Sequence, residues 1–297
     1  MKRASLLAVV LVVLAGCARG GGAGPGEEGL ERLRRQADEA LARYDKAVAD
    51  AGGTQRFAPV GELTGQVGDW EAQIQDGKAA LLTGRVITAA TLPEAPQPTG
   101  EVIWAAGARQ TLPLISAGEA LRQLVAAAAP GDCGNCRPLE VTGARLGTTA
   151  IRTTRGDATA PAWQYTIKGS AVLVTRVAVA ASAAVQVVPP SWDPYNAPGG
   201  MAIESATASA DGKRLTVKFT GAPRGGDQPC GSDYTAEAVE SDNAVVVIVV
   251  EHPHAPGEAC TAIGAPRSTT VDLAKPLGDR AVLEVQQGTP VPVTTGG

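Results

Sequence analysis

Two hairpin patterns near the end of the chain constrain the fold most strongly. Residues 202–221 and 234–251 each contain two strand-like runs, rich in β-branched and other apolar residues, on either side of a short turn at Asp211-Gly212 and at Ser241 to Asn243. Asp-Gly between two such runs is typical of a tight β-hairpin. Two more strand-like runs follow, and about six strands at this spacing predict a small β-sandwich at 201–293.

A proline-rich segment precedes this region. Residues 188–200 read VPPSWDPYNAPGG, and four prolines exclude a central strand because proline cannot donate to the sheet's hydrogen-bond ladder. We therefore expect an interdomain linker at 189–200. The alternating run VLVTRVAVA (172–180), rich in valine, is typical of a half-buried antiparallel strand.

The region before the linker, residues 54–188, predicts a mixed β domain with one short helix. Strands are expected at 80–91 and, as separate segments, at 139–149 and 150–156. The helix is expected at 116–129, where Ser116 and Glu119 have the spacing of a capping box, so that Ser116 is the N-cap.

Residues 27–53 give the clearest helical pattern. Two acidic residues occupy the first turn, and Gly52-Gly53 end the segment. Its apolar residues recur at spacings of three and four, as on one face of a helix: Leu30, Leu33, Ala37, Leu41, Tyr44 and Val48. The whole chain thus predicts a mainly β (α+β) fold, an N-terminal helix followed by two antiparallel β-rich domains.

The first 17 residues have the pattern of an export signal. Lys2 and Arg3 precede a short apolar core, Leu6 to Leu14, which is too short to span a bilayer as a helix. The segment Leu14-Ala15-Gly16-Cys17 resembles the lipobox of bacterial lipoproteins. An ordinary secreted protein or an uncleaved signal anchor, with a cysteine there by chance, is the alternative.

The lipobox resemblance implies a signal peptide at 1–16 and a lipid, including palmitate-type acyl chains, on Cys17. Two or three acyl chains are enough for stable anchoring, and the glycine-rich segment at 17–26 fits a flexible tether. The expected location is the extracytoplasmic face of the cell membrane. The helix, the PAWQYTIKG run and the closing VDLAKPLGDRAVLEVQQGTPV also resemble uncharacterised cell-envelope lipoproteins of actinobacteria, a resemblance that implies no activity.

The charge balance argues against nucleic acid as a partner. The chain has 26 basic and 30 acidic residues. Removal of the signal peptide takes away Lys2 and Arg3, which leaves 24 basic residues and a formal net charge of −6. Without a basic stripe, nucleic-acid binding is not expected.

Lipidation of Cys17 would leave four cysteines in an oxidising compartment, which predicts two disulfides. Pairing Cys133 with Cys136 and Cys230 with Cys260 keeps each bridge within one domain. A thioredoxin-like role for the CGNC segment requires a helix after the cysteines, whereas here the helix comes before them and a strand after.

The histidine pair and the aromatic residues of the linker complete the candidates. His252 and His254 could form half of a metal site, but Pro253 and the strand end favour a solvated segment, so neither a metal nor a cofactor is expected. Trp192 and Tyr195 are candidate ligand contacts, with packing at the domain junction as the alternative.

No catalytic residues are predicted, because the common hydrolase motifs and phosphate loops are missing from the sequence. We therefore expect a membrane-anchored protein that acts by non-catalytic binding or scaffolding, with an envelope protein, glycan or peptide partner. The competing class is an envelope enzyme, either a thiol-disulfide oxidoreductase that uses the CGNC pair or an unrecognised hydrolase.

Overall fold

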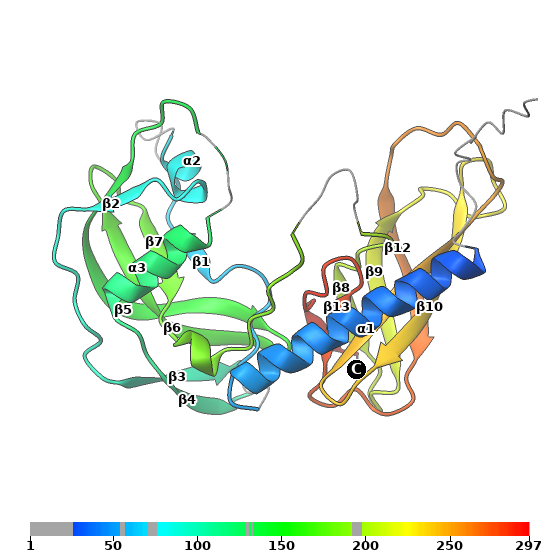
Figure 1. The fold of residues 1–297 in the computed structure, drawn as a ribbon, viewed down its shortest axis with the longest axis horizontal. Coiled ribbons are helices and arrows are strands. Elements are labelled where there is room, and N and C mark those ends of the chain that lie inside the picture. The colour runs from blue at the N-terminus through cyan, green and yellow to red at the C-terminus, as the bar shows by residue number, and fades with distance from the viewer. Residues whose placement is uncertain are drawn as a thin grey trace, which may run out of the picture.

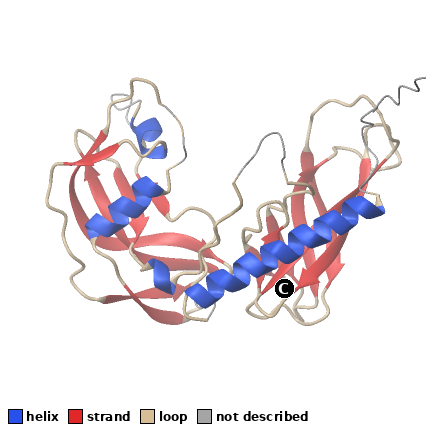
Figure 2. Ribbon diagram, viewed as in Figure 1, coloured by secondary structure: helices blue, strands red, loops and turns tan. Residues whose placement is uncertain are grey.

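The computed structural model describes residues 26–53, 57–70, 76–128, 131, 133–191 and 198–296. There the chain forms two β-rich units side by side, with one long helix crossing the second (Figures 1 and 2). The predicted mainly β fold with an N-terminal helix is confirmed. Within the described residues, no helix is both long and apolar enough to cross a membrane.

A single seven-stranded sheet forms the first unit. Its centre is the long hairpin of β5 and β6, and β2 pairs with the edge of β5 that faces away from β6. The other edge of β6 pairs with two strands, β7 and β3. β7 pairs in turn with β1, and β3 with β4. The strand bounds are β1 Thr64–Val67, β2 Val86–Thr88, β3 Thr99–Trp104, β4 Arg109–Pro113, β5 Leu139–Thr153, β6 Gly156–Ile167 and β7 Leu173–Val177.

Two expectations for this unit were wrong in detail. Residues 139–149 and 150–156 do not form separate segments, because β5 runs without interruption to Thr153. The start of the predicted strand at 80–91 is helical, since α2 covers Gly77–Leu82 and only Val86–Thr88 is a strand.

Helix α3 (Ala117–Ala126) covers one face of this sheet. The hydroxyl of Ser116 accepts the backbone N–H of Glu119 at 3.2 Å, which confirms the predicted N-cap. Tyr165 of β6 donates its hydroxyl to the carbonyl of Ala117 at 2.8 Å and fixes the helix to the sheet.

The second unit contains two sheets, with strand orders β10-β11-β13 and β12-β9-β8-β14. Its hairpins turn at the predicted positions, Asp211-Gly212 and Ser241 to Asn243. The bounds are β8 Ser205–Ala208, β9 Arg214–Gly221, β10 Ser232–Glu240, β11 Ala244–Pro253, β12 Ala265–Asp272, β13 Ala281–Glu284 and β14 Val293–Thr295. A short 3-10 helix, η2 (Ala181–Ala183), lies at the end of the first unit.

Strand β11 explains why residues 244–249 are apolar without alternation. Val245 and Val247 point into the core between the two sheets, whereas Val246 and Ile248 point to the opposite face. A strand buried on both faces reads as a continuous hydrophobic run.

The opposite face of β11 is covered by the N-terminal helix α1 (Glu27–Asp50) (Figure 1). The apolar side of α1, with Leu33, Leu41 and Tyr44, packs on this sheet, so the helix forms a third layer on the second unit. Arg34 adds an ion pair with Glu237 of β10, Nε–Oε1 2.7 Å, and this bond raises the pKa of Arg34. The two ends of the described chain therefore build one unit, and the first unit is inserted between them.

Candidate functional site

The CGNC segment forms a disulfide, as predicted, between Cys133 and Cys136. Cys136 is 5% exposed and packs in the core beneath α3, while Cys133 is partly exposed. The sulfur of Cys133 accepts a hydrogen bond from the hydroxyl of Thr83 at 3.3 Å and lies 3.9 Å from Nη1 of Arg85. The two sulfurs therefore differ in access, and two polar side chains lie near the accessible one.

The second predicted disulfide, Cys230–Cys260, is also formed. It borders a pocket of about 530 Å³ at the edge of the second unit. Glu258 accepts the backbone N–H of Cys230 at 2.8 Å, and its carboxylate lies within 4.8 Å of both sulfurs. Because each sulfur is bonded to the other, neither is a thiolate, and these three residues do not form a metal site in the oxidised protein.

Each of the two histidines is bonded to its own protein partner. Nε2 of His252 lies 2.8 Å from the hydroxyl of Thr235, and Nδ1 of His254 lies 2.9 Å from the carbonyl oxygen of Gly226. Three further predicted site residues, the lipidation site Cys17 and the candidate ligand contacts Trp192 and Tyr195, lie outside the described residues.

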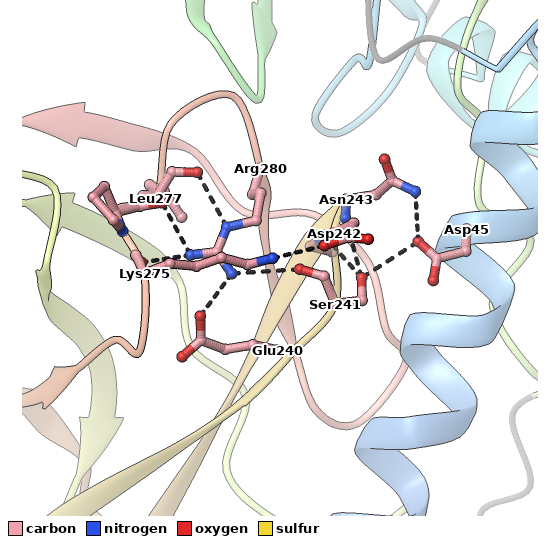
Figure 3. A network of polar contacts seen from close by, with 10 residues as sticks. Asp45, Glu240, Ser241, Asp242, Asn243, Lys275, Leu277 and Arg280 are labelled. Carbon is pink, nitrogen blue, oxygen red and sulfur yellow. Dashed lines mark hydrogen bonds and ion pairs between the residues drawn. The ribbon is translucent and has the colours of Figure 1, made fainter.

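A polar network of the second unit surrounds Arg280 (Figure 3). This arginine is 6% exposed and pairs with Glu240 at 2.6 Å. Its other donors reach the carbonyl oxygens of Lys275, Pro276 and Leu277. Burial raises the pKa of Glu240, but bonds from the Ala274 N–H and from Arg280 outweigh it, so that the pKa is lowered overall.

The same network reaches α1, because Asp45 accepts bonds from Ser241 at 3.3 Å and from Asn243 at 2.9 Å (Figure 3). Arg280 thus has a carboxylate and several carbonyl oxygens as partners. A charge satisfied so completely by the protein stabilises the loops and offers little to a ligand. We interpret this network as structural.

A cavity of about 570 Å³ between the two units has a different character, and we call it the junction cleft. From the first unit, the lining residues are 59–63, Ala127, Arg152 of β5 and Arg176 of β7. The segment at 185–187 lies between the units. The second unit contributes Glu204 and the loop after β13. Small-molecule sites form preferentially at such boundaries.

Arg176 is the buried charge of the junction cleft. It is 6% exposed and lies on β7 between Thr64 of β1 and Trp163 of β6. Its Nη1 donates to the hydroxyl of Thr64 at 3.0 Å, whereas its Nε has no hydrogen-bond partner among the described residues. Over the same part of the chain, Arg176 forms no ion pair.

Burial lowers the pKa of Arg176, and the negative charge of nearby Glu62 opposes this effect only in part. Glu62 itself is exposed. A buried guanidinium with a single neutral partner costs free energy in the ligand-free protein. An anion in the junction cleft would give the guanidinium an ionic partner.

The sequence contained a signal for Arg176 that motif analysis overlooked. In the run at 172–180, Val174, Arg176 and Ala178 occupy alternate positions and therefore share a face of the strand. Val174 and Ala178 are buried in the core beneath α3. Arg176 is therefore a charged residue on a strand face that is otherwise apolar, and this pattern indicates a buried charge.

We compared the chain with known proteins. No family model, curated protein or solved structure matches it.

Proposed function

We propose that this protein is a lipid-anchored, extracytoplasmic binding protein of the cell envelope that holds its ligand in the junction cleft without catalysing a reaction. The observation that carries the proposal is Arg176, a buried charge that lines a cavity and lacks an ionic partner within the described residues. A buried charge without an ionic partner that lines a cleft is a candidate functional site.

The anchor is supported by sequence and by cysteine chemistry. The Leu14-Ala15-Gly16-Cys17 segment resembles a lipobox, and the two disulfides fit an oxidising compartment. A glycine-rich segment then precedes α1, which begins at Glu27.

Intact-mass analysis after expression in a bacterium that processes lipoproteins tests the anchor. We expect a chain that starts at Cys17 and carries the mass of two or three acyl chains. Cys17→Ser should lose that mass, whereas Cys133→Ser should keep it. A mature chain that starts elsewhere and carries no acyl mass would contradict the anchor.

A photocrosslinking amino acid at Gln186, which lines the junction cleft, tests binding. In the native envelope we expect a light-dependent adduct at position 186, and Arg176→Met should reduce its yield. The same amino acid at position 145, an exposed site on β5, should form no adduct. Equal adducts at both positions, or none at 186, would count against a site in the cleft.

The environment of Cys133 favours a second candidate, thiol-disulfide exchange. Once an external dithiol has reduced the pair and become a disulfide itself, the Cys133 thiolate would attack one sulfur of an envelope protein's disulfide. The mixed disulfide forms as the other sulfur of that disulfide leaves as a thiolate. Cys136 would then lose its proton and attack the Cys133 sulfur, which releases the substrate as a thiolate and restores the Cys133–Cys136 bond. Arg85, with Nη1 3.9 Å from that sulfur, is placed to stabilise the thiolate. The single hydroxyl proton of Thr83, at 3.3 Å from the sulfur, is shared with the carbonyl oxygen of Ala79 at 2.8 Å.

Thiol trapping in glutathione buffers separates exchange from a structural bridge. For exchange, the pair should be half-reduced near −180 to −270 mV, the range of thiol oxidoreductases. In a Cys136→Ser background, where Cys133 is a free thiol, the further change Arg85→Met should slow alkylation of Cys133 at neutral pH. The control change Arg109→Met, on β4, should leave the rate unchanged. A pair that stays oxidised below about −300 mV would be a structural bridge.

A further inference from the structure

A second cavity adjoins the junction cleft. It has a volume of about 330 Å³ and lies between α2, the end of α3 and β1; we call it the α2–α3 pocket. Glu62 and Ala127 line both cavities. Thr64, which lines the α2–α3 pocket, is the residue that Arg176 contacts from the cleft, at 3.0 Å. The buried guanidinium therefore lies where the two cavities meet.

The α2–α3 pocket is mainly apolar on its helical side. Leu81 and Leu82 of α2 and Leu124 of α3 line this side, together with the exposed Lys78 of α2. Leu82 is 57% exposed although it is a large hydrophobic residue. An exposed leucine at the rim of an apolar pocket is stabilised when a hydrocarbon group covers it. The two adjoining cavities thus differ in chemistry, one with a buried cation and one with aliphatic walls.

We infer that the two cavities together bind a small amphiphile, whose single carboxylate or phosphate group pairs with Arg176 and whose short hydrocarbon chain occupies the α2–α3 pocket. This inference rests on the proposed function and specifies its ligand class. An anionic head would give Arg176 the charge-assisted, bidentate partner that guanidinium favours.

The acidic residues of the cleft are consistent with this assignment. Glu204 already accepts a bond from the hydroxyl of Thr220 at 2.7 Å on the second unit. Glu62 and Glu204 are exposed, so solvent screens their charges, whereas Arg176 is buried. Arg152 in the cleft and Lys78 in the α2–α3 pocket are exposed as well, so Arg176 is the buried charge among the lining residues.

Calorimetry on the mature chain with Cys17→Ser, which needs no detergent, tests the inference with defined probes. Octanoate and octyl phosphate carry both groups, and their relative affinities distinguish a carboxylate from a phosphate ligand. Acetate and inorganic phosphate lack the chain, octanol lacks the charge, and octylamine reverses it. We expect binding of octanoate or octyl phosphate and at least tenfold weaker binding of the other probes.

Two variants test the two cavities separately. Arg176→Met should weaken binding of the anionic probe by roughly 10- to 100-fold, the loss expected for a hydrogen bond to a charged group; Arg145→Met, on the exposed side of β5, should not. Ala127→Phe should fill the boundary and weaken binding, whereas Ala126→Phe, one residue earlier and outside both cavities, should leave it unchanged.

Circular dichroism shows whether each variant folds. If Arg176→Met does not fold, Ala127→Phe still tests the site. Equal affinity for octanoate and octylamine, or unchanged affinity in both cavity variants, would overturn the inference. If no probe binds while position 186 still forms its specific adduct in the envelope, the amphiphile is wrong and the binding function stands. If neither is seen, both fail.

Discussion

Two buried arginines of this chain have opposite surroundings. Arg280 is paired with Glu240 and bonded to backbone carbonyls, whereas Arg176, with the same 6% exposure, has only the Thr64 hydroxyl among its hydrogen-bond partners in the described chain. Removing one partner of a buried pair is costly, while removing an unpartnered buried charge is neutral or favourable. Ordinary sequence patterns did not distinguish the two, because the difference depends on what surrounds each side chain in the fold.

Glu240→Gln should destabilise the protein by about 3 kcal/mol, because it leaves the buried Arg280 without its ionic partner. This value is the lower end of the range for a broken buried ion pair, since Gln keeps the bond from the Ala274 N–H. Chemical denaturation measures this value. The matched control is Glu101→Gln, which removes an exposed pair with Arg109 and should cost less than about 1 kcal/mol. Equal losses in the two variants would contradict a structural role for the network.

The Glu240 pair also predicts a pH dependence. The folded protein lowers the pKa of Glu240 below its value in the unfolded chain, about 4.3 for Glu. The carboxylate therefore contributes its stability above the unfolded pKa, and this contribution is lost as the pH falls through the folded pKa. The stability difference between wild type and Glu240→Gln should shrink on acidification below pH 4, and a difference that grows there would refute the assignment.

At the scale of elements, local signals were sufficient for some features and insufficient for others. The hairpin turns could be predicted because their residues, such as Asp211-Gly212, specify the turn themselves. The partner of α1 could not, because Arg34 and Glu237 lie 203 residues apart, and the amphipathic pattern of a helix does not identify the surface that it covers. The continuity of β5 was missed because Thr148, Thr149 and Ala150 are exposed or half-buried, so that no apolar alternation crosses the predicted break at 149/150.

Leu41→Ala should lower the free energy of unfolding by about 2–4 kcal/mol, because this residue is 7% exposed between α1 and the sheet and leaves a cavity. Glu39→Ala, on the exposed face of the same helix, should change it by less than about 0.5 kcal/mol. Urea midpoints of the two variants give the comparison. Equal midpoints would mean that α1 is not packed on the sheet in solution.

The two disulfides should differ in their contribution to stability. Cys230–Cys260 spans 30 residues and Cys133–Cys136 spans 3, so the loop-entropy model gives about 3–4 kcal/mol for the first and about 2 for the second. Double Ser variants at each pair, compared by thermal unfolding, should follow this order. A reversed order would mean that native-state contacts, rather than loop closure, decide their contributions.

The whole molecule is assembled from interleaved parts of the chain. The second unit needs the helix at 27–50 as well as the strands after the linker, and the first unit is inserted between them. The two β-rich regions were predicted from the sequence. The packing of the N-terminal helix on β11 and β13, near the other end of the chain, was not. The junction cleft was unpredictable for the same reason, since residues far apart in sequence line it.

Residues 198–296 expressed alone should aggregate or remain unfolded, because the apolar face of β11 with Val246 and Ile248 would be exposed to water. A chain in which a flexible linker joins residues 26–53 directly to residue 198 should fold. Dispersion of amide resonances in NMR spectra separates the two outcomes. A well-folded 198–296 fragment would show that α1 is dispensable for this unit.

The position of α1 has a mechanical consequence. The helix lies along the outer sheet of the second unit, with Glu27 at the end remote from the first unit (Figure 1). Its 24 residues extend about 36 Å. Tension applied through the N-terminus therefore loads all the helix–sheet contacts together, in shear, instead of peeling them apart in sequence. The first unit lies to one side of this helix axis, so a pull through Glu27 along the axis acts first on the contacts between α1 and the sheet.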